Sequence, residues 1–88
     1  MEKEKIILVK ELLNTDHIAT VSAAARLIEA IGSSKNIKLD FFGISGVEEP
    51  FLQELLVNWR KKNPLVMINI VNACDDVENI IHKAFKTR

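Results

Sequence analysis

Three short apolar runs alternate with three helix-like patterns in this chain, and this alternation constrains the fold more than any other feature. The runs cover residues 6–9, 37–41 and 65–71 and are rich in Ile, Leu and Val. Each run precedes apolar residues at helical spacing, within about residues 20–31, 51–59 and 77–85. A β-α-β-α-β-α order favours parallel strands joined by right-handed crossovers. We therefore predict an α/β fold with a small, mainly parallel sheet.

The helical pattern in the middle of the chain has the clearest boundaries. Pro50 lies where the first turn of a helix accepts proline, and Asn63-Pro64 stops the pattern. The first helix is capped by Thr20 or Ser22, and Gly32 ends it. Residues 9–13 fit a helix as well as a continuation of the first strand, and the sequence leaves both open. The expected buried positions of the second and third helices are Phe51, Leu52, Leu55, Leu56, Trp59, Val77, Ile80, Ile81, Ala84 and Phe85.

The expected topology leaves one face of the sheet without helices. If the strands lie in sequence order, right-handed crossovers place the helices mainly on the same face. Lys38 and Asp40 suit the other face, but apolar residues of the outer strands must also point there. Such a strip either binds a second copy of the chain, giving a homodimer, or is partly covered by the N-terminal tail. The candidate sets are Ile6/Leu8 or Ile7/Val9 on the first strand, and Leu65/Met67/Val71 or Val66/Ile68/Ile70 on the last.

Length and composition exclude several protein classes. The 88 residues suffice for one domain, so we predict a single domain spanning residues 1–88. Twelve Lys and Arg balance twelve Asp and Glu, so a nucleic-acid partner is not expected. A single cysteine excludes an internal disulfide, and no apolar run approaches the roughly 20 residues of a membrane helix. We therefore expect a cytoplasmic protein that does not bind membranes.

Motifs that would indicate catalysis are absent from the sequence. It has no phosphate-binding loop, no Gly-x-Gly-x-x-Gly and no Cys-x-x-Cys. His17 and His82 have no partners at ligand spacing, so neither a metal nor a cofactor is expected. Cys74 precedes a helix, which favours a reactive thiol, but the adjacent Asp75 and Asp76 oppose it. We expect no enzyme; the alternatives are a small thiol-dependent enzyme using Cys74 and a structural subunit of a larger assembly.

One stretch of the chain, residues 37–56, resembles a known family. A strand ending in Leu-Asp-Phe, a short loop with glycine, and Phe-x-x-Glu-Leu-Leu on a helix are similar to the STAS-like domain family. This family comprises small prokaryotic domains, largely of unknown function, related to sulphate-transporter and anti-sigma-factor-antagonist domains. The resemblance extends over about residues 6–85. It implies a non-catalytic regulatory or protein-interaction module whose partner is a protein, such as a signalling or sigma-control component.

The sequence departs from this resemblance at the regulatory position. In phosphorylatable relatives, a serine follows an aspartate at the start of the helix after this strand. Here Glu48 occupies the aspartate position and Glu49 the serine position, while Ser45 is out of register. The phosphorylatable serine switch is therefore not expected. A fixed carboxylate there either resembles the phosphorylated state or is an ordinary carboxylate of a helix N-terminus.

The loop and helix start in residues 42–53 are the predicted partner-binding surface. Loops at the carboxyl ends of parallel strands gather binding groups in open α/β sheets. Two glycines expose the backbone, and two adjacent glutamates suit a basic partner. The alternative is that Ile44 and Val47 fill the core while the glutamates cap the helix. The predicted binding residues are Phe42, Gly43, Ser45, Gly46, Glu48 and Glu49.

Overall fold

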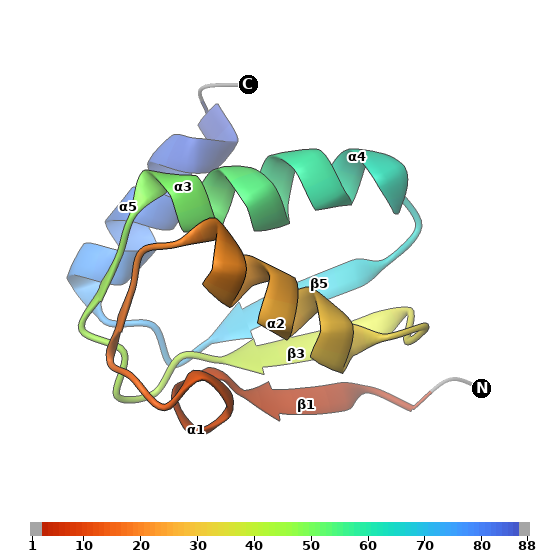
Figure 1. Ribbon diagram of the computed structural model, residues 1–88, viewed down its shortest axis with the longest axis horizontal. Coiled ribbons are helices and arrows are strands. Elements are labelled where there is room, and N and C mark those ends of the chain that lie inside the picture. The colour runs from red at the N-terminus through yellow and green to blue at the C-terminus, as the bar shows by residue number, and fades with distance from the viewer. Residues whose placement is uncertain (1–2, 87–88) are drawn as a thin grey trace.

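The computed structural model describes residues 3–86 of the chain, and side chains as far as Lys83. Its main sheet has three parallel strands in the order β1-β3-β5 (Figure 1). Leu39 of the central strand is in register with Ile7 on one side and Ile70 on the other. The predicted α/β fold with a parallel sheet is therefore confirmed. The strands are β1 (Lys5–Leu8), β3 (Asn36–Asp40) and β5 (Met67–Val71).

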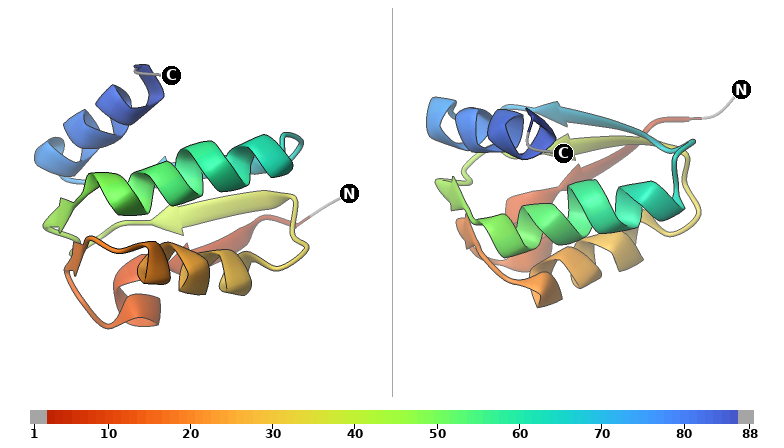
Figure 2. Two further views of the ribbon diagram at one scale, coloured as in Figure 1. Left: turned by 45° about the horizontal axis from the view of Figure 1, so that its top comes forward. Right: turned by 90° about the horizontal axis from the view of Figure 1, so that it is seen from above.

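Helix α2 and the helix that begins as α3 cover one face of this sheet, in agreement with helices predicted mainly on one face, whereas α5 lies beside the β5 edge (Figures 1 and 2). Helix α2 lies near β1, the helix that begins as α3 packs against α2, and α5 packs beside α3. A short helix follows β1 directly, which decides the alternative left open for residues 9–13 in favour of a helix. The helices are α1 (Val9–Leu13), α2 (Val21–Ile31), α3 (Glu49–Leu52), η1 (Gln53–Trp59), α4 (Arg60–Lys62) and α5 (Asp75–Lys86).

Helix α2 begins and ends as its sequence predicts, but its apolar stripe is narrower. Thr20 is the N-cap, and its hydroxyl accepts a 3.1 Å hydrogen bond from the backbone N–H of Ala23. Gly32 follows the last turn with a φ of 59°. Val21 shares the helical spacing of the apolar residues within 20–31 but is 50% exposed. The buried residues are Ala24, Leu27 and Ile31.

The next helix is continuous from Glu49 to Lys62 and changes its winding on the way. Its middle part, η1, is a π-helix of seven residues. Such winding is rare, and the sequence carries no signal for it. Asn63 ends the helix, and its side chain donates a 3.0 Å hydrogen bond to the backbone O of Trp59. The predicted stripe is confirmed, since Phe51, Leu52, Leu55 and Leu56 are buried and Trp59 is half-buried.

The core lies between the sheet and these helices. Ile37 and Leu39 alternate with Lys38 and Asp40, and both apolar side chains are fully buried, as predicted for a strand with one apolar face. In α5, Val77 and Ile81 are buried and Ile80 is half-buried. The predicted continuation of that stripe to Ala84 and Phe85 lies outside the described side chains.

A second, smaller pairing was missed by the sequence. Strand β2 (His17–Ile18) pairs in parallel with β4 (Gly46–Val47), so the loop predicted before the helix start ends in a short strand that the sequence did not predict. The backbone N–H of Ser45 donates to the O of Asp16 at 2.7 Å, and that of Glu48 donates to the O of Ile18 at 2.9 Å. This pairing fastens the segment before α3 to the segment before α2.

The sheet face opposite the helices is open over the described residues (Figure 2). The register places Ile6 and Leu8 of β1 on this face, and Met67 and Val71 of β5. Ile6 is 59% exposed and Met67 is 67% exposed, whereas Ile7 is buried and Ile68 packs against the core. The alternatives left open for the outer strands are thereby decided. The predicted partial cover by the N-terminal tail is seen at Glu4, whose Oε1 lies 3.4 Å from Nζ of Lys38 on this face, while residues 1 and 2 lie outside the described part.

Candidate functional site

Acidic side chains gather at the carboxyl ends of the strands, the left end of the molecule in Figure 1. They do so because Asp40 ends β3, while α3 and α5 begin with acidic residues. Lysines lie mostly at the opposite end, where β1 begins and α4 ends. The neutral chain is therefore electrically asymmetric. Eight of its twelve acidic residues belong to the acidic end: Glu11, Asp16, Asp40, Glu48, Glu49, Asp75, Asp76 and Glu78.

Phe42 stands out at this end because its ring is exposed on an ordered loop. It is 76% exposed, although its neighbours in the loop, Phe41 and Ile44, are buried. The backbone N–H of Phe42 donates to Oδ1 of Asp40 at 2.9 Å, and the side-chain amide of Asn72 donates to the same oxygen at 3.1 Å. The loop therefore has a defined shape while its aromatic side chain faces solvent.

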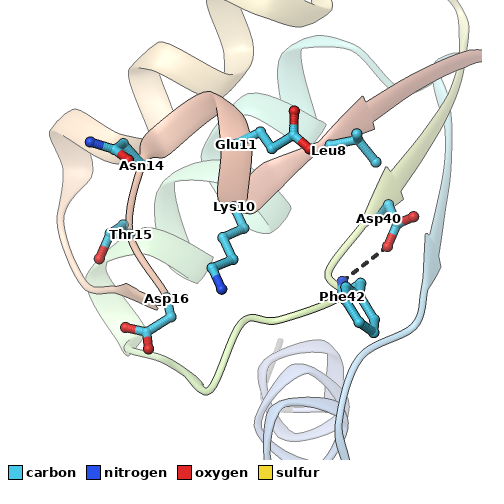
Figure 3. Close-up of a pocket in the computed structure, with 8 residues that line it drawn as sticks. All are labelled: Leu8, Lys10, Glu11, Asn14, Thr15, Asp16, Asp40 and Phe42. Atoms are coloured by element: carbon cyan, nitrogen blue, oxygen red, sulfur yellow. Dashed lines mark hydrogen bonds between the residues drawn. The ribbon is translucent and has the colours of Figure 1, made fainter.

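A groove of about 530 Å³ lies beside Phe42, between α1 and the loop (Figure 3). Lys10 extends from α1 toward this loop. A Cβ on Gly43 would lie 2.8 Å from Cδ of Lys10, and Gly43 has a φ of +84°. Gly43 is therefore needed for the turn and for the close approach of Lys10. Gly43 is also exposed, which agrees with the predicted accessible backbone at this position.

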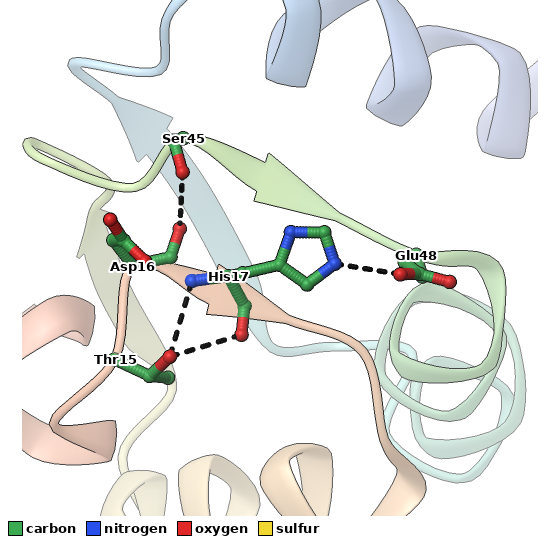
Figure 4. Close-up of polar contacts among 5 residues, drawn as sticks. All are labelled: Thr15, Asp16, His17, Ser45 and Glu48. Atoms are coloured by element: carbon green, nitrogen blue, oxygen red, sulfur yellow. Dashed lines mark hydrogen bonds and ion pairs between the residues drawn. The ribbon is translucent and has the colours of Figure 1, made fainter.

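Glu48 and Gly46 both contact His17, a residue of β2 (Figure 4). Nε2 of His17 is 2.6 Å from Oε2 of Glu48, and both side chains are about half-exposed. Glu48 occupies the N-cap position of α3 but makes no side-chain capping bond, so the capping alternative is wrong for this side chain. A Cβ on Gly46 would lie 2.7 Å from Nδ1 of His17. The imidazole thus covers Gly46 and holds Glu48.

The other predicted residues differ in how far they are available to a partner. Ser45 donates its hydroxyl to the backbone O of Asp16 at 3.1 Å, so its side chain is engaged in the fold. Glu49 is exposed on the first turn of α3. Ile44 and Val47 are buried, so the alternative in which these two residues fill the core is confirmed for them. Phe42 and Glu49 are exposed on the predicted surface, whereas the likewise exposed Ser45 and Glu48 are engaged by Asp16 and His17.

Segment 10–17 contributes to this surface and was missed as part of it. The turn-favouring residues at 14–17 predict only a turn after the first strand. The pairing of β2 with β4 brings Asp16 and His17 against Ser45 and Gly46. Lys10 reaches the same place from α1 (Figure 3).

The family is decided by a comparison with sequence models of protein families. A model described as a STAS-like domain of unknown function (DUF4325) matches residues 23–78. The chain belongs to this family. The resemblance found in residues 37–56 is thereby confirmed, and the matched region runs from the first turn of α2 into α5. No curated protein and no solved structure matches the chain.

Cys74, the candidate nucleophile of the alternative enzyme, lies directly before α5 in this STAS-like domain. Cys74 is exposed, and its Sγ lies 3.8 Å from the backbone O of Ile44. Residues 3–83 contain no cluster of three or more His, Cys, Asp or Glu side chains that could hold a metal ion. Among its described helices, none combines the length and the apolar character needed to cross a bilayer.

Proposed function

We propose that this STAS-like domain is a non-catalytic protein-interaction module that binds a basic protein partner at its acidic end. The observation that carries the proposal is Phe42, an aromatic ring 76% exposed on a loop whose backbone is fixed by Asp40 and Asn72. Aromatic residues that insert into a partner commonly supply a large share of interface energy. The domain would act in regulation through the partner that it recruits.

Three physical features favour binding at this place. The loop is held by hydrogen bonds at 2.9 and 3.1 Å to one carboxylate oxygen, so little conformational entropy is lost when a partner orders it further. The surrounding carboxylates steer a basic partner toward Phe42 and disfavour acidic ones. The groove beside the ring, about 530 Å³, gives room for a partner side chain next to Lys10 and Asp40.

The same surface supports recognition without a phosphorylated serine. Glu49 stands where the resemblance places the serine, and it is exposed at the start of α3. Glu48 is bound to His17 at 2.6 Å, and the hydroxyl of Ser45 is used by Asp16. We propose that the acidic helix start is a permanent part of the docking surface. Binding then depends on the presence of the partner and on ionic strength.

The test is recovery of partners by the tagged protein, expressed in its own cells and quantified by mass spectrometry. Phe42→Ala removes the anchor and Glu49→Lys reverses the charge beside it. Leu65→Ala is the matched control, because Leu65 is 79% exposed and lies between α4 and β5, at the opposite end. We expect a basic protein whose recovery falls about tenfold or more with Phe42→Ala, the loss typical of an interface hot spot.

Two outcomes would contradict the proposal, provided that the variants remain folded. Both variants change exposed side chains, so their urea unfolding curves should match that of the original protein within about 0.5 kcal/mol. If both variants recover every partner as the original does, the surface lies elsewhere. If the recovered partner is acidic, the electrostatic part of the proposal is wrong.

A further inference from the structure

The open face of the β1-β3-β5 sheet is a second surface. It shares Leu8 and Asp40 with the groove beside Phe42, but it rests on other observations than the proposed docking of a basic partner. We infer that this face binds a second copy of the chain, with the central strands antiparallel across a two-fold axis. Three exposed apolar side chains lie on it: Ile6 at 59%, Leu8 at 44% and Met67 at 67% exposure. Val71 lies half-buried on the same face, and the side chains beside these apolar residues, Lys38, Asp40 and Asn69, are charged or polar and restrict the kind of molecule that can bind.

The parallel register arranges this face in rows across the strands. One row contains Ile6, Lys38 and Asn69, and the next contains Leu8, Asp40 and Val71. Side chains at one level of a parallel sheet point the same way, and successive levels on one face are two residues apart. Each row therefore has an apolar residue on β1 and a charged residue of the central strand beside it.

The charges on the central strand make the face complementary to itself. We consider a two-fold axis that lies in the plane between the two packed sheets, runs across the strands and passes between the two rows. It places Lys38 opposite Asp40 of the second copy and Ile6 opposite Leu8 of the second copy. Because of the two-fold symmetry, each of these contacts occurs twice in the dimer. A two-fold axis along the strands would instead place Lys38 opposite Lys38, and like charges in contact are unfavourable. The charge pattern thus selects the antiparallel arrangement.

The size of the face indicates a weak dimer. Three strands about 4.8 Å apart and five residues rising about 3.3 Å each cover roughly 240 Å² in projection. Stable interfaces bury about 800 Å² on each partner, so this contact belongs to the transient class. Lys38 also contacts Oε1 of Glu4 at 3.4 Å within its own chain, so the second copy must share this lysine. Association should therefore depend on concentration and weaken with salt.

Sedimentation equilibrium of the full chain from about 1 µM to about 1 mM tests the inference. We expect the weight-average mass to rise from 9.9 kDa toward twice that value. Ile6→Lys and Met67→Lys should each weaken association at least tenfold. Leu65→Lys is the matched control, since it places the same charge on an apolar residue that is 79% exposed outside the sheet. The control should associate as the original protein does.

A charge test separates the antiparallel arrangement from general stickiness. Lys38→Glu would face Asp40 of the second copy and should weaken association. Adding Asp40→Asn to it removes that repulsion and should restore part of the loss, while keeping the oxygen that accepts from Phe42 and Asn72. Phe42→Ala should leave association unchanged, which distinguishes this surface from the proposed docking site.

A monomer at 1 mM, or association unaffected by Ile6→Lys and Met67→Lys, would overturn the inference. Absence of the rescue would refute the antiparallel arrangement.

Discussion

Replacing Gly46 with alanine should damage the fold through one side chain, that of His17. The new Cβ would lie 2.7 Å from Nδ1 and 3.1 Å from Cε1 of His17, so the imidazole must move. Gly46 does not have a positive φ, and the backbone therefore accepts alanine without strain. The whole cost should come from displacing His17 and from losing its 2.6 Å contact with Glu48.

The expected loss in the free energy of unfolding follows from these two costs and from one gain. A side chain forced about 30° off its rotamer costs roughly 0.5–1.5 kcal/mol, and a half-exposed ion pair contributes about 0.2–1 kcal/mol. Alanine returns about 0.4–1 kcal/mol by restricting the unfolded chain. Gly46→Ala should therefore lower the free energy of unfolding by about 1 kcal/mol. In a His17→Ala background only the favourable term remains, so the coupling between the two sites should be about 1–2 kcal/mol.

Urea unfolding of the four proteins, followed by the fluorescence of Trp59, measures this coupling. Trp59 is the only tryptophan and is half-buried in η1. Gly43→Ala provides the contrast, because its φ of +84° strains alanine whether or not Lys10 is present. Lys10→Ala should therefore rescue Gly43→Ala poorly. An equal cost of Gly46→Ala with and without His17 would refute the reasoning.

The remaining predictions concern the start of α2 and the thiol. Thr20→Ala should lower the free energy of unfolding by about 1 kcal/mol, because it removes the hydroxyl that accepts from Ala23. Ser22→Ala, an exposed change within the same helix, should stay within about 0.5 kcal/mol in the same urea measurement. Cys74→Ser should leave partner recovery unchanged if the protein is a docking module. A loss of function with Cys74→Ser at full stability would support the thiol-dependent enzyme instead.

The main sheet could be predicted because its signals are local and repeated. Ile37 and Leu39 alternate with polar residues, and this period of two assigns the central strand and its buried face without further information. The outer strands are apolar on both sides, so the sequence allowed Ile6 or Ile7 to face the helices. The parallel register with Leu39 decided this question, and register is a property of the pairing between strands.

The surroundings of the candidate site could be predicted only in part, because they depend on contacts between distant segments. The sequence identified the end of the sheet at which the loop lies and the acidic helix start, since both follow from strand direction and from the position of Glu48 and Glu49. It missed the partner of Glu48, because His17 is 31 residues away and belongs to a strand of two residues. A strand of two residues is too short to show a periodicity in the sequence, and its pairing with β4 forms only when the core has brought α1 and the loop together.

The conformational freedom of glycine would by itself be enough to explain why a loop residue such as Gly46 is a glycine. The imidazole above it shows that the close approach of a side chain is the stronger reason for glycine there.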